Sequence, residues 1–197
     1  MAGYQSVNQA NSRPSVLIPA RGFAGISCAS SLSSRHFNVC LVDQKSHFEF
    51  LPNIHEILSG VKRPRDVRLD LAQQMSALQH RFVKASVEGI APEKKQVILN
   101  NGTTLNYDYL VVGLGAIDAS YGVEGIEPNA FSFKSAEQCA AIYHQLNELR
   151  VASKPSRVTI IGAGITGVEA LGEIFRNEQF SHLKITILEA QSRLLPK

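Results

Sequence analysis

Two glycine-rich segments have the residue types and spacing that suit the phosphates of a dinucleotide. In the second of them, Gly162, Gly164 and Gly167 follow an apolar run at residues 158–161. In such a pattern the first glycine makes a tight turn, the second lets the backbone approach a pyrophosphate, and the third lets a helix pack close to a strand. The pyrophosphate then lies on free N–H groups at the positive end of that helix. We expect cofactor contacts from the whole turn, which comprises Gly162, Ala163, Gly164, Ile165, Thr166 and Gly167.

An acidic residue ends the next apolar run. Residues 185–188 form this run, and Glu189 follows it. A carboxylate at this strand end accepts hydrogen bonds from the ribose hydroxyls. It would also repel a 2′-phosphate, which favours NADH over NADPH. Because strand, turn, helix, second strand and acid occur in the expected order, the segment predicts an NADH-binding unit.

The first glycine-rich segment fills the same pattern only in part. Gly22 and Gly25 hold the second and third glycine positions, whereas Ala20 holds the first and Pro19 precedes it. Alanine suits a turn in which φ stays negative, and a proline is tolerated at a strand end. Two interpretations remain open: a working phosphate turn, or a degenerate one that binds weakly or not at all. The candidate cofactor contacts are Ala20, Arg21, Gly22, Phe23, Ala24, Gly25 and the strand-ending Asp43.

Alternating strands and helices must position these turns. Buried strands are predicted at residues 16–18, 37–42, 81–90, 96–99, 109–112, 158–161 and 185–188. Helices are predicted at 22–34, 52–58, 70–79, 137–150 and 164–175, with Asp70 as an N-cap, and a turn is predicted at Asn101–Gly102. This alternation predicts an α/β fold with a mostly parallel sheet.

The composition of the chain excludes several classes of protein. The 197 residues are 44% apolar with a net charge of +3, so a globular core is expected and nucleic acid is not an expected partner. The three cysteines are too far apart for a C-x-x-C pair, which favours a reducing compartment. The first 14 residues lack the apolar stretch of a secretory signal, and no apolar run approaches the ~20 residues of a membrane helix. The six histidines show no metal spacing, so no metal is predicted.

A third segment, together with the two turns, resembles a known superfamily. Residues 106–115, NYDYLVVGLG, resemble the segment that precedes the second nucleotide unit in FAD-dependent pyridine nucleotide oxidoreductases. Residues 42–52 and 162–173 are similar to type II NADH dehydrogenases and their relatives. The resemblance extends over residues 16–196. It implies two Rossmann-like dinucleotide-binding domains, a FAD domain with an inserted NADH domain, both incomplete in this chain.

The resemblance also implies roles for individual residues. Gly22, Gly25 and Asp43 would hold the FAD pyrophosphate and ribose, and the second turn with Glu189 would bind NADH. Glu169 would lie near the contact between nicotinamide and flavin, as the one candidate catalytic residue. Glu173 shares its helix face, and a solvated carboxylate at a helix start explains it at least as well. The remaining expected FAD contacts are Lys45, Pro52, Val87, Leu114 and Gly115.

The implied chemistry is hydride transfer from NADH to FAD, followed by electron transfer to a quinone or a similar acceptor. Disulfide reductases carry a redox cysteine pair soon after the ribose acid, and residues 44–60 contain no cysteine. This absence argues against disulfide-reductase chemistry. Cys139 lies in the predicted helix at 137–150 and is interpreted as a small core residue. A ferredoxin reductase-like, rubredoxin reductase-like or sulfide:quinone oxidoreductase-like flavoprotein remains an alternative. A degenerate, non-catalytic dinucleotide-binding fragment is another.

The resemblance further predicts how the chain is divided. Residues 1–14 would be a flexible N-terminus, 15–122 the first part of the FAD domain, 123–154 a connector with a helix, and 155–197 the first part of the NADH domain. We expect a fragment that retains FAD poorly and turns over little by itself. A cytoplasmic location is expected, with peripheral contact to the inner face of a membrane through a C-terminal part that this chain lacks.

Overall fold

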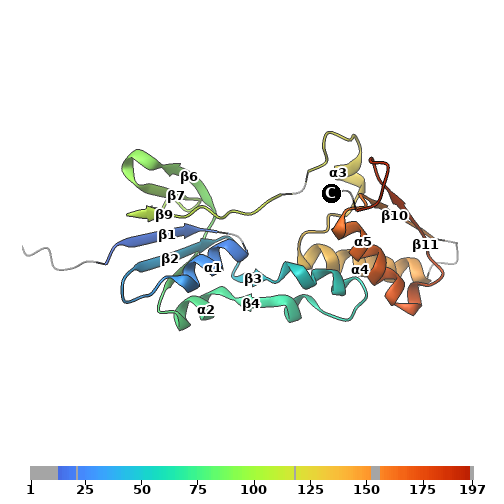
Figure 1. Cartoon of the computed structure of the whole chain (residues 1–197), viewed down its shortest axis with the longest axis horizontal. Coiled ribbons are helices and arrows are strands. Elements are labelled where there is room, and N and C mark those ends of the chain that lie inside the picture. Colours follow the sequence, from blue (N-terminus) through green and yellow to red (C-terminus); the bar gives the residue numbers. More distant parts are fainter. Residues whose placement is uncertain (1–12, 21, 118, 152–155, 196–197) are drawn as a thin grey trace, which may run out of the picture. The chain divides into compact units, whose positions relative to one another are not determined.

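Two compact units make up the chain (Figure 1). The computed structural model describes residues 13–20, 22–117, 119–151 and 156–195. The first unit contains the chain up to Phe48 together with Leu69–Ala116, and the second contains Glu49–Arg68 and the chain from Ile117 onwards. Each unit is therefore built from two separate stretches of sequence. The domain boundaries predicted from the sequence stay predictions.

A parallel sheet forms the centre of the first unit. Its strand order is β5-β2-β1-β9, with β1 next to β2 in the register Ser15↔Asn38 to Pro19↔Val42. Apolar side chains of β1 and β2 are buried, as the continuous apolar runs predict, because helices cover one set of them and an antiparallel meander covers the other. The elements are β1 (Ser15–Pro19), α1 (Phe23–Ser31), β2 (Asn38–Asp43), α2 (Leu71–Ala77), β5 (Arg81–Lys84) and β9 (Tyr109–Leu110).

The N-terminus of α2 is capped as the sequence predicts. The Asp70 side chain accepts a hydrogen bond from the Gln73 backbone N–H at 2.7 Å. This bond satisfies one of the N–H groups that the first turn of a helix leaves without an intrahelical acceptor.

An antiparallel meander also belongs to the first unit, and it corrects the predicted strand at residues 81–90. That stretch forms two strands, because the chain turns after β5. The Ser86 N–H donates to the Asn100 side chain at 3.1 Å, and the Asn100 N–H donates to the Ser86 carbonyl at 2.9 Å. The predicted turn is confirmed, with Gly102 at φ +78°. The meander contains β6 (Val87–Ala91), the 3-10 helix η3 (Pro92–Lys94), β7 (Gln96–Leu99) and β8 (Thr104–Asn106).

The second unit repeats the strand–helix–strand plan. β10 (Arg157–Ile161) pairs in parallel with β11 (Lys184–Leu188), and α5 (Ile165–Arg176) connects them. Ile174, Phe180 and Leu146 form a buried cluster between these elements and α4 (Ala136–Val151). The predicted short helix at 52–58 is a 3-10 helix, η1 (Leu51–Ile57). The smaller elements are η2 (Pro64–Val67), α3 (Ile126–Asn129) and η4 (Glu178–Phe180).

The expected α/β class is confirmed, because a parallel pair joined by a helix occurs in both units. One further pair, β3 (His47–Glu49) with β4 (Arg68–Asp70), forms a two-stranded sheet that the sequence did not predict. Cys139 is fully buried in α4, as a small core residue should be. Burial and the nearby Glu49 carboxylate raise the pKa of its thiol to about 12. Among the described residues, no helix combines the length and apolar character needed to cross a membrane.

Candidate dinucleotide-binding sites

The turn between β1 and α1 depends on two glycines in different ways. Gly22 has φ +97° and ψ −151°, a backbone conformation that is essentially restricted to glycine. A Cβ on Gly25 would lie 2.1 Å from the Ala20 Cβ, so only glycine lets α1 approach the strand this closely. Ala20 is 3% exposed, and its methyl group fills the space opposite Gly25. The alanine at the first glycine position is thus accommodated by close packing.

The backbone at this turn continues the sheet for one residue beyond β1. The Ala20 N–H donates to the Val42 carbonyl at 3.1 Å, and Ala20 also bridges to Gly113. The Gly113 N–H donates to the Pro19 carbonyl at 2.9 Å. Pro19 is buried in β1, and its carbonyl takes part in the hydrogen bonding of the sheet. Arg21, which is also a predicted contact of this turn, lies outside the described residues.

A small hollow opens beside this turn. Asp43, at the end of β2, is 8% exposed, and its Oδ1 accepts a hydrogen bond from the Lys45 N–H at 2.9 Å. Phe48 contacts Phe23 edge to face, with ring centroids 5.0 Å apart. Sequence reasoning missed Phe48, although its place soon after the strand-ending acid was a usable signal. The hollow is lined by Ala20, Gly22, Ile26, Leu41, Asp43, Phe48 and Leu71.

The other residues predicted to contact FAD are spread over several elements. Val87 begins β6, and Ala24 lies in α1, where its Cβ would be 3.4 Å from a Cβ on Gly113. Leu114 is half exposed after β9, and Gly115 has φ +76°. These residues belong to the first unit, whereas Pro52 lies in η1 of the second unit.

The turn between β10 and α5 gives each of its three glycines a separate role. Gly162 has φ +98° and so requires the conformational freedom of glycine. A Cβ on Gly167 would lie 2.0 Å from the Gly162 carbonyl oxygen, whereas a Cβ on Gly164 would meet no atom within 4 Å. These are a tight turn, close packing of helix on strand, and open space for a ligand. Ile165, which begins α5, is 71% exposed.

Glu189 contacts this turn directly. Its Oε2 accepts a hydrogen bond from the Ala163 N–H at 2.7 Å, and its Oε1 accepts one from the Gln191 N–H at 3.0 Å. These backbone hydrogen bonds, that of Gln191 first and that of Ala163 second, lower the pKa of the Glu189 carboxyl. The acid predicted to bind ribose therefore lies within hydrogen-bond distance of the phosphate turn.

The two glutamates of α5 have different surroundings. Glu169 is partly exposed, and its Oε2 lies 4.0 Å from the His55 Nδ1. Glu173 is buried; it accepts a hydrogen bond from the Ser59 hydroxyl and lies 3.3 Å from Arg176. The interpretation of Glu173 as a solvated carboxylate is therefore wrong. It fixes α5 to the segment after η1, while a catalytic role for Glu169 stays a prediction.

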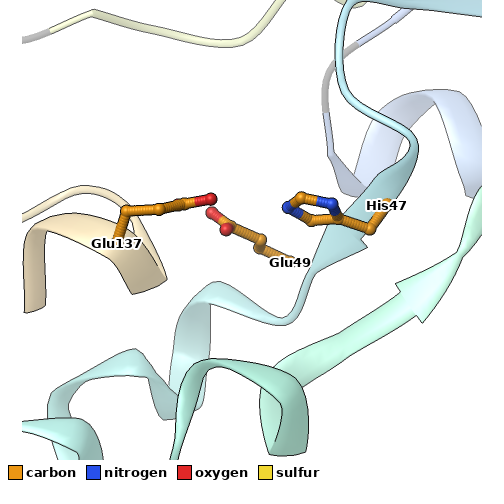
Figure 2. Close-up of side chains that lie close together, drawn as sticks. All are labelled: His47, Glu49 and Glu137. Atoms are coloured by element: carbon orange, nitrogen blue, oxygen red, sulfur yellow. The ribbon is translucent and has the colours of Figure 1, made fainter. Parts of the chain in front are cut away.

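Glu49 at the end of β3 and Glu137 at the start of α4 form another carboxylate pair in this unit. Figure 2 shows the Glu137 side chain extending toward Glu49. The Arg68 guanidinium contacts both, with its Nη2 3.0 Å from the Glu49 Oε1 and in close contact with the Glu137 Oε1. This cation balances the two carboxylates, so their proximity does not by itself indicate a metal site. His47, which Figure 2 also draws, belongs to the first unit.

Comparison with known families agrees with this geometry. The family model described as pyridine nucleotide-disulphide oxidoreductase matches residues 18–197. The chain belongs to this family. A type II NADH:quinone oxidoreductase of Staphylococcus aureus is 27% identical over 95% of this chain and 52% of its own length. A probable NADH dehydrogenase of Dictyostelium discoideum is 26% identical over 91% of this chain and 46% of its own.

Solved structures share the fold at lower identity. NDH2 from Plasmodium falciparum in complex with NADH matches with a TM-score of 0.81 and 19% identity, over 94% of this chain and 43% of its own. The sulfide:quinone oxidoreductase of Aquifex aeolicus matches with a TM-score of 0.78 and 22% identity, over 90% and 43%. The chain thus spans about half the length of these relatives.

Proposed function

We propose that this chain supplies the FAD-binding and NADH-binding turns of an NADH dehydrogenase-like oxidoreductase. In this function a hydride passes from NADH to FAD, and the electrons pass on to a quinone or a similar acceptor. The observation that carries the proposal is the second turn, in which Gly162, Gly164 and Gly167 each fill one role of a dinucleotide fingerprint. The names of the curated relatives support NADH as donor and quinone as acceptor.

The residues of the second turn fit NADH. Space is open beside Gly164, where the backbone of a dinucleotide fold approaches the pyrophosphate. The first N–H groups of α5 have no intrahelical acceptor, so they are available to donate hydrogen bonds to phosphate oxygens. Glu189 provides a negative charge at the end of β11, which suits a ribose diol and disfavours a 2′-phosphate.

The residues of the first turn fit the adenosine diphosphate part of FAD. Gly22 supplies the unusual backbone conformation, Gly25 lets α1 approach the strand, and Asp43 lies at the rim of the neighbouring hollow. Phe48 gives this hollow an aromatic wall, and Phe23 packs edge to face against Phe48. When bound, the flavin would supply the hydride-accepting chemistry, and the chain's own part is to bind and orient the two cofactors. Peripheral contact with a membrane belongs to the same proposal.

The first experiment measures binding of NADH to the full 197-residue chain by the increase in NADH fluorescence. We expect saturable binding, with an affinity for NADPH at least ~10-fold lower because of Glu189, an ordinary size for removing a favourable contact and adding a like charge. Gly164→Ala should weaken NADH binding by a similar factor, since its methyl group would enter the open space beside the turn. Gly172→Ala is the matched control, because a Cβ there also meets open space but lies away from the turn.

The second experiment tests FAD. The chain is incubated with FAD, passed over a desalting column, and its absorption is recorded before and after anaerobic addition of NADH. A retained flavin band that bleaches with NADH supports the binding of both cofactors and hydride transfer between them. A colourless chain that still binds NADH would agree with the poor FAD retention expected of this chain, and it would support only the NADH-binding part of the proposal. A chain that binds neither cofactor would refute the proposed function.

A further inference from the structure

Ala163 lies between Gly162 and Gly164 in the second turn, and hydrogen bonds hold both its N–H and its carbonyl. It is fully buried. Its N–H donates to the Glu189 Oε2 at 2.7 Å, and its carbonyl accepts a hydrogen bond from the Leu195 N–H at 2.9 Å. The other Glu189 oxygen accepts the Gln191 N–H at 3.0 Å. One carboxylate therefore joins the turn before α5 to the segment after β11.

This arrangement determines which backbone groups remain for a ligand. The Gly162 N–H donates to the Leu188 carbonyl at 2.8 Å, and the Ala163 N–H donates to Glu189. Both are thus directed toward β11 and the residue at its end. A bound phosphate would then accept hydrogen bonds from the first N–H groups of α5, which follow Gly164 in the chain.

We propose that Glu189 is a positioning residue, which holds the phosphate-binding turn through Ala163 and the segment after β11 through Gln191. This role is separate from any contact with ribose, and its relevance to NADH rests on the proposed function. It is carried by geometry, since both carboxylate oxygens face a backbone N–H within 3.0 Å. Hydrogen bonds from N–H groups to an ionised carboxylate are stronger than those to a neutral acceptor.

Glutamine separates the positioning role from ribose binding. A carboxylate has two acceptor oxygens, whereas a side-chain amide has one acceptor oxygen and one NH₂ donor. In Glu189→Gln, one of the two backbone N–H groups must therefore face another donor. A ribose diol both donates and accepts, so it tolerates the amide. The substitution is nearly isosteric, and it changes little apart from charge and donor pattern.

The test is amide hydrogen exchange, measured by NMR on the ¹⁵N-labelled full chain without ligand. In Glu189→Gln we expect exchange at least ~10-fold faster at Ala163 or Gln191, the factor that a loss of about 1.4 kcal/mol produces. Glu178→Gln is the control, because Glu178 is exposed on η4 of the same unit and the substitution also removes one negative charge. Exchange within about twofold of wild type at both amides of Glu189→Gln would overturn the proposal.

An acid titration of the wild-type chain, followed by its amide proton shifts, gives a second test that needs no variant. If Glu189 holds both groups, the amide proton shifts of Ala163 and Gln191 will titrate together, with one midpoint below the ordinary glutamate pKa. Two different midpoints, or no titration, would also overturn the proposal. NADH titration of the same wild-type sample tests the proposed function separately, because exchange protection without NADH binding would refute only that function.

Discussion

The close packing at Gly167 makes a quantitative prediction when it is compared with Gly172 on the same helix. Alanine is favoured over glycine inside a helix by about 0.8–1 kcal/mol. At Gly172 a Cβ meets open space, so Gly172→Ala should stabilise the chain by about that amount. At Gly167 the Cβ would lie 2.0 Å from the Gly162 carbonyl oxygen and 3.1 Å from its carbonyl carbon. Both of these are backbone atoms, so no side chain can move away to relieve the clash.

The expected magnitude follows from these two effects. Overpacking costs about 1–3 kcal/mol, and a backbone obstacle places Gly167→Ala at the upper end. After the helical preference for alanine is subtracted, Gly167→Ala should destabilise by about 2 kcal/mol, which separates the two variants by about 3 kcal/mol.

The assay is urea unfolding followed by far-UV circular dichroism, since the chain has no tryptophan. Amide exchange along α5 gives the local stability of the same unit. If Gly167→Ala proved as stable as Gly172→Ala, the close approach of α5 to the turn would not exist in solution, and the reasoning for the second site would fail with it.

Three further predictions concern other contacts. Ala20→Gly removes a buried methyl group and adds backbone freedom, so it should destabilise the first unit by about 1–2 kcal/mol in urea unfolding; unchanged stability would contradict the packing against Gly25. Glu173→Ala and Ser59→Ala should each cost about 1–3 kcal/mol, and a double-mutant cycle that shows no coupling would contradict their hydrogen bond. Hydrogen bonds from the Ser15 N–H and hydroxyl lower the pKa of Asp108. Its contribution to stability should therefore be full above the unfolded aspartate pKa and be lost as pH falls through the lower folded value, and a chain with Asp108→Asn should lack this part of the acid dependence.

The sequence was sufficient for features that depend on neighbouring residues. The two strand–turn–helix units, the Asp70 cap and the burial of Cys139 each follow from a local pattern, and each is present in the structure. The break between β5 and β6 was missed because it depends on Asn100, which is 14 residues from Ser86. The burial of Glu173 was missed because its partner Ser59 is 114 residues away. A hydropathy pattern carries no information about such distant pairs.

The positive φ angle falls at different places in the two turns, and this affects how each motif can diverge. In the first turn it belongs to Gly22, the second fingerprint glycine, whereas in the second turn it belongs to Gly162, the first. Substitution at the first fingerprint position is therefore tolerated at Ala20, and the same change at Gly162 would strain the backbone. A motif search that weights all three glycines equally takes no account of this difference between the turns. Which glycine of each turn can be replaced therefore depends on the torsion angles of that turn.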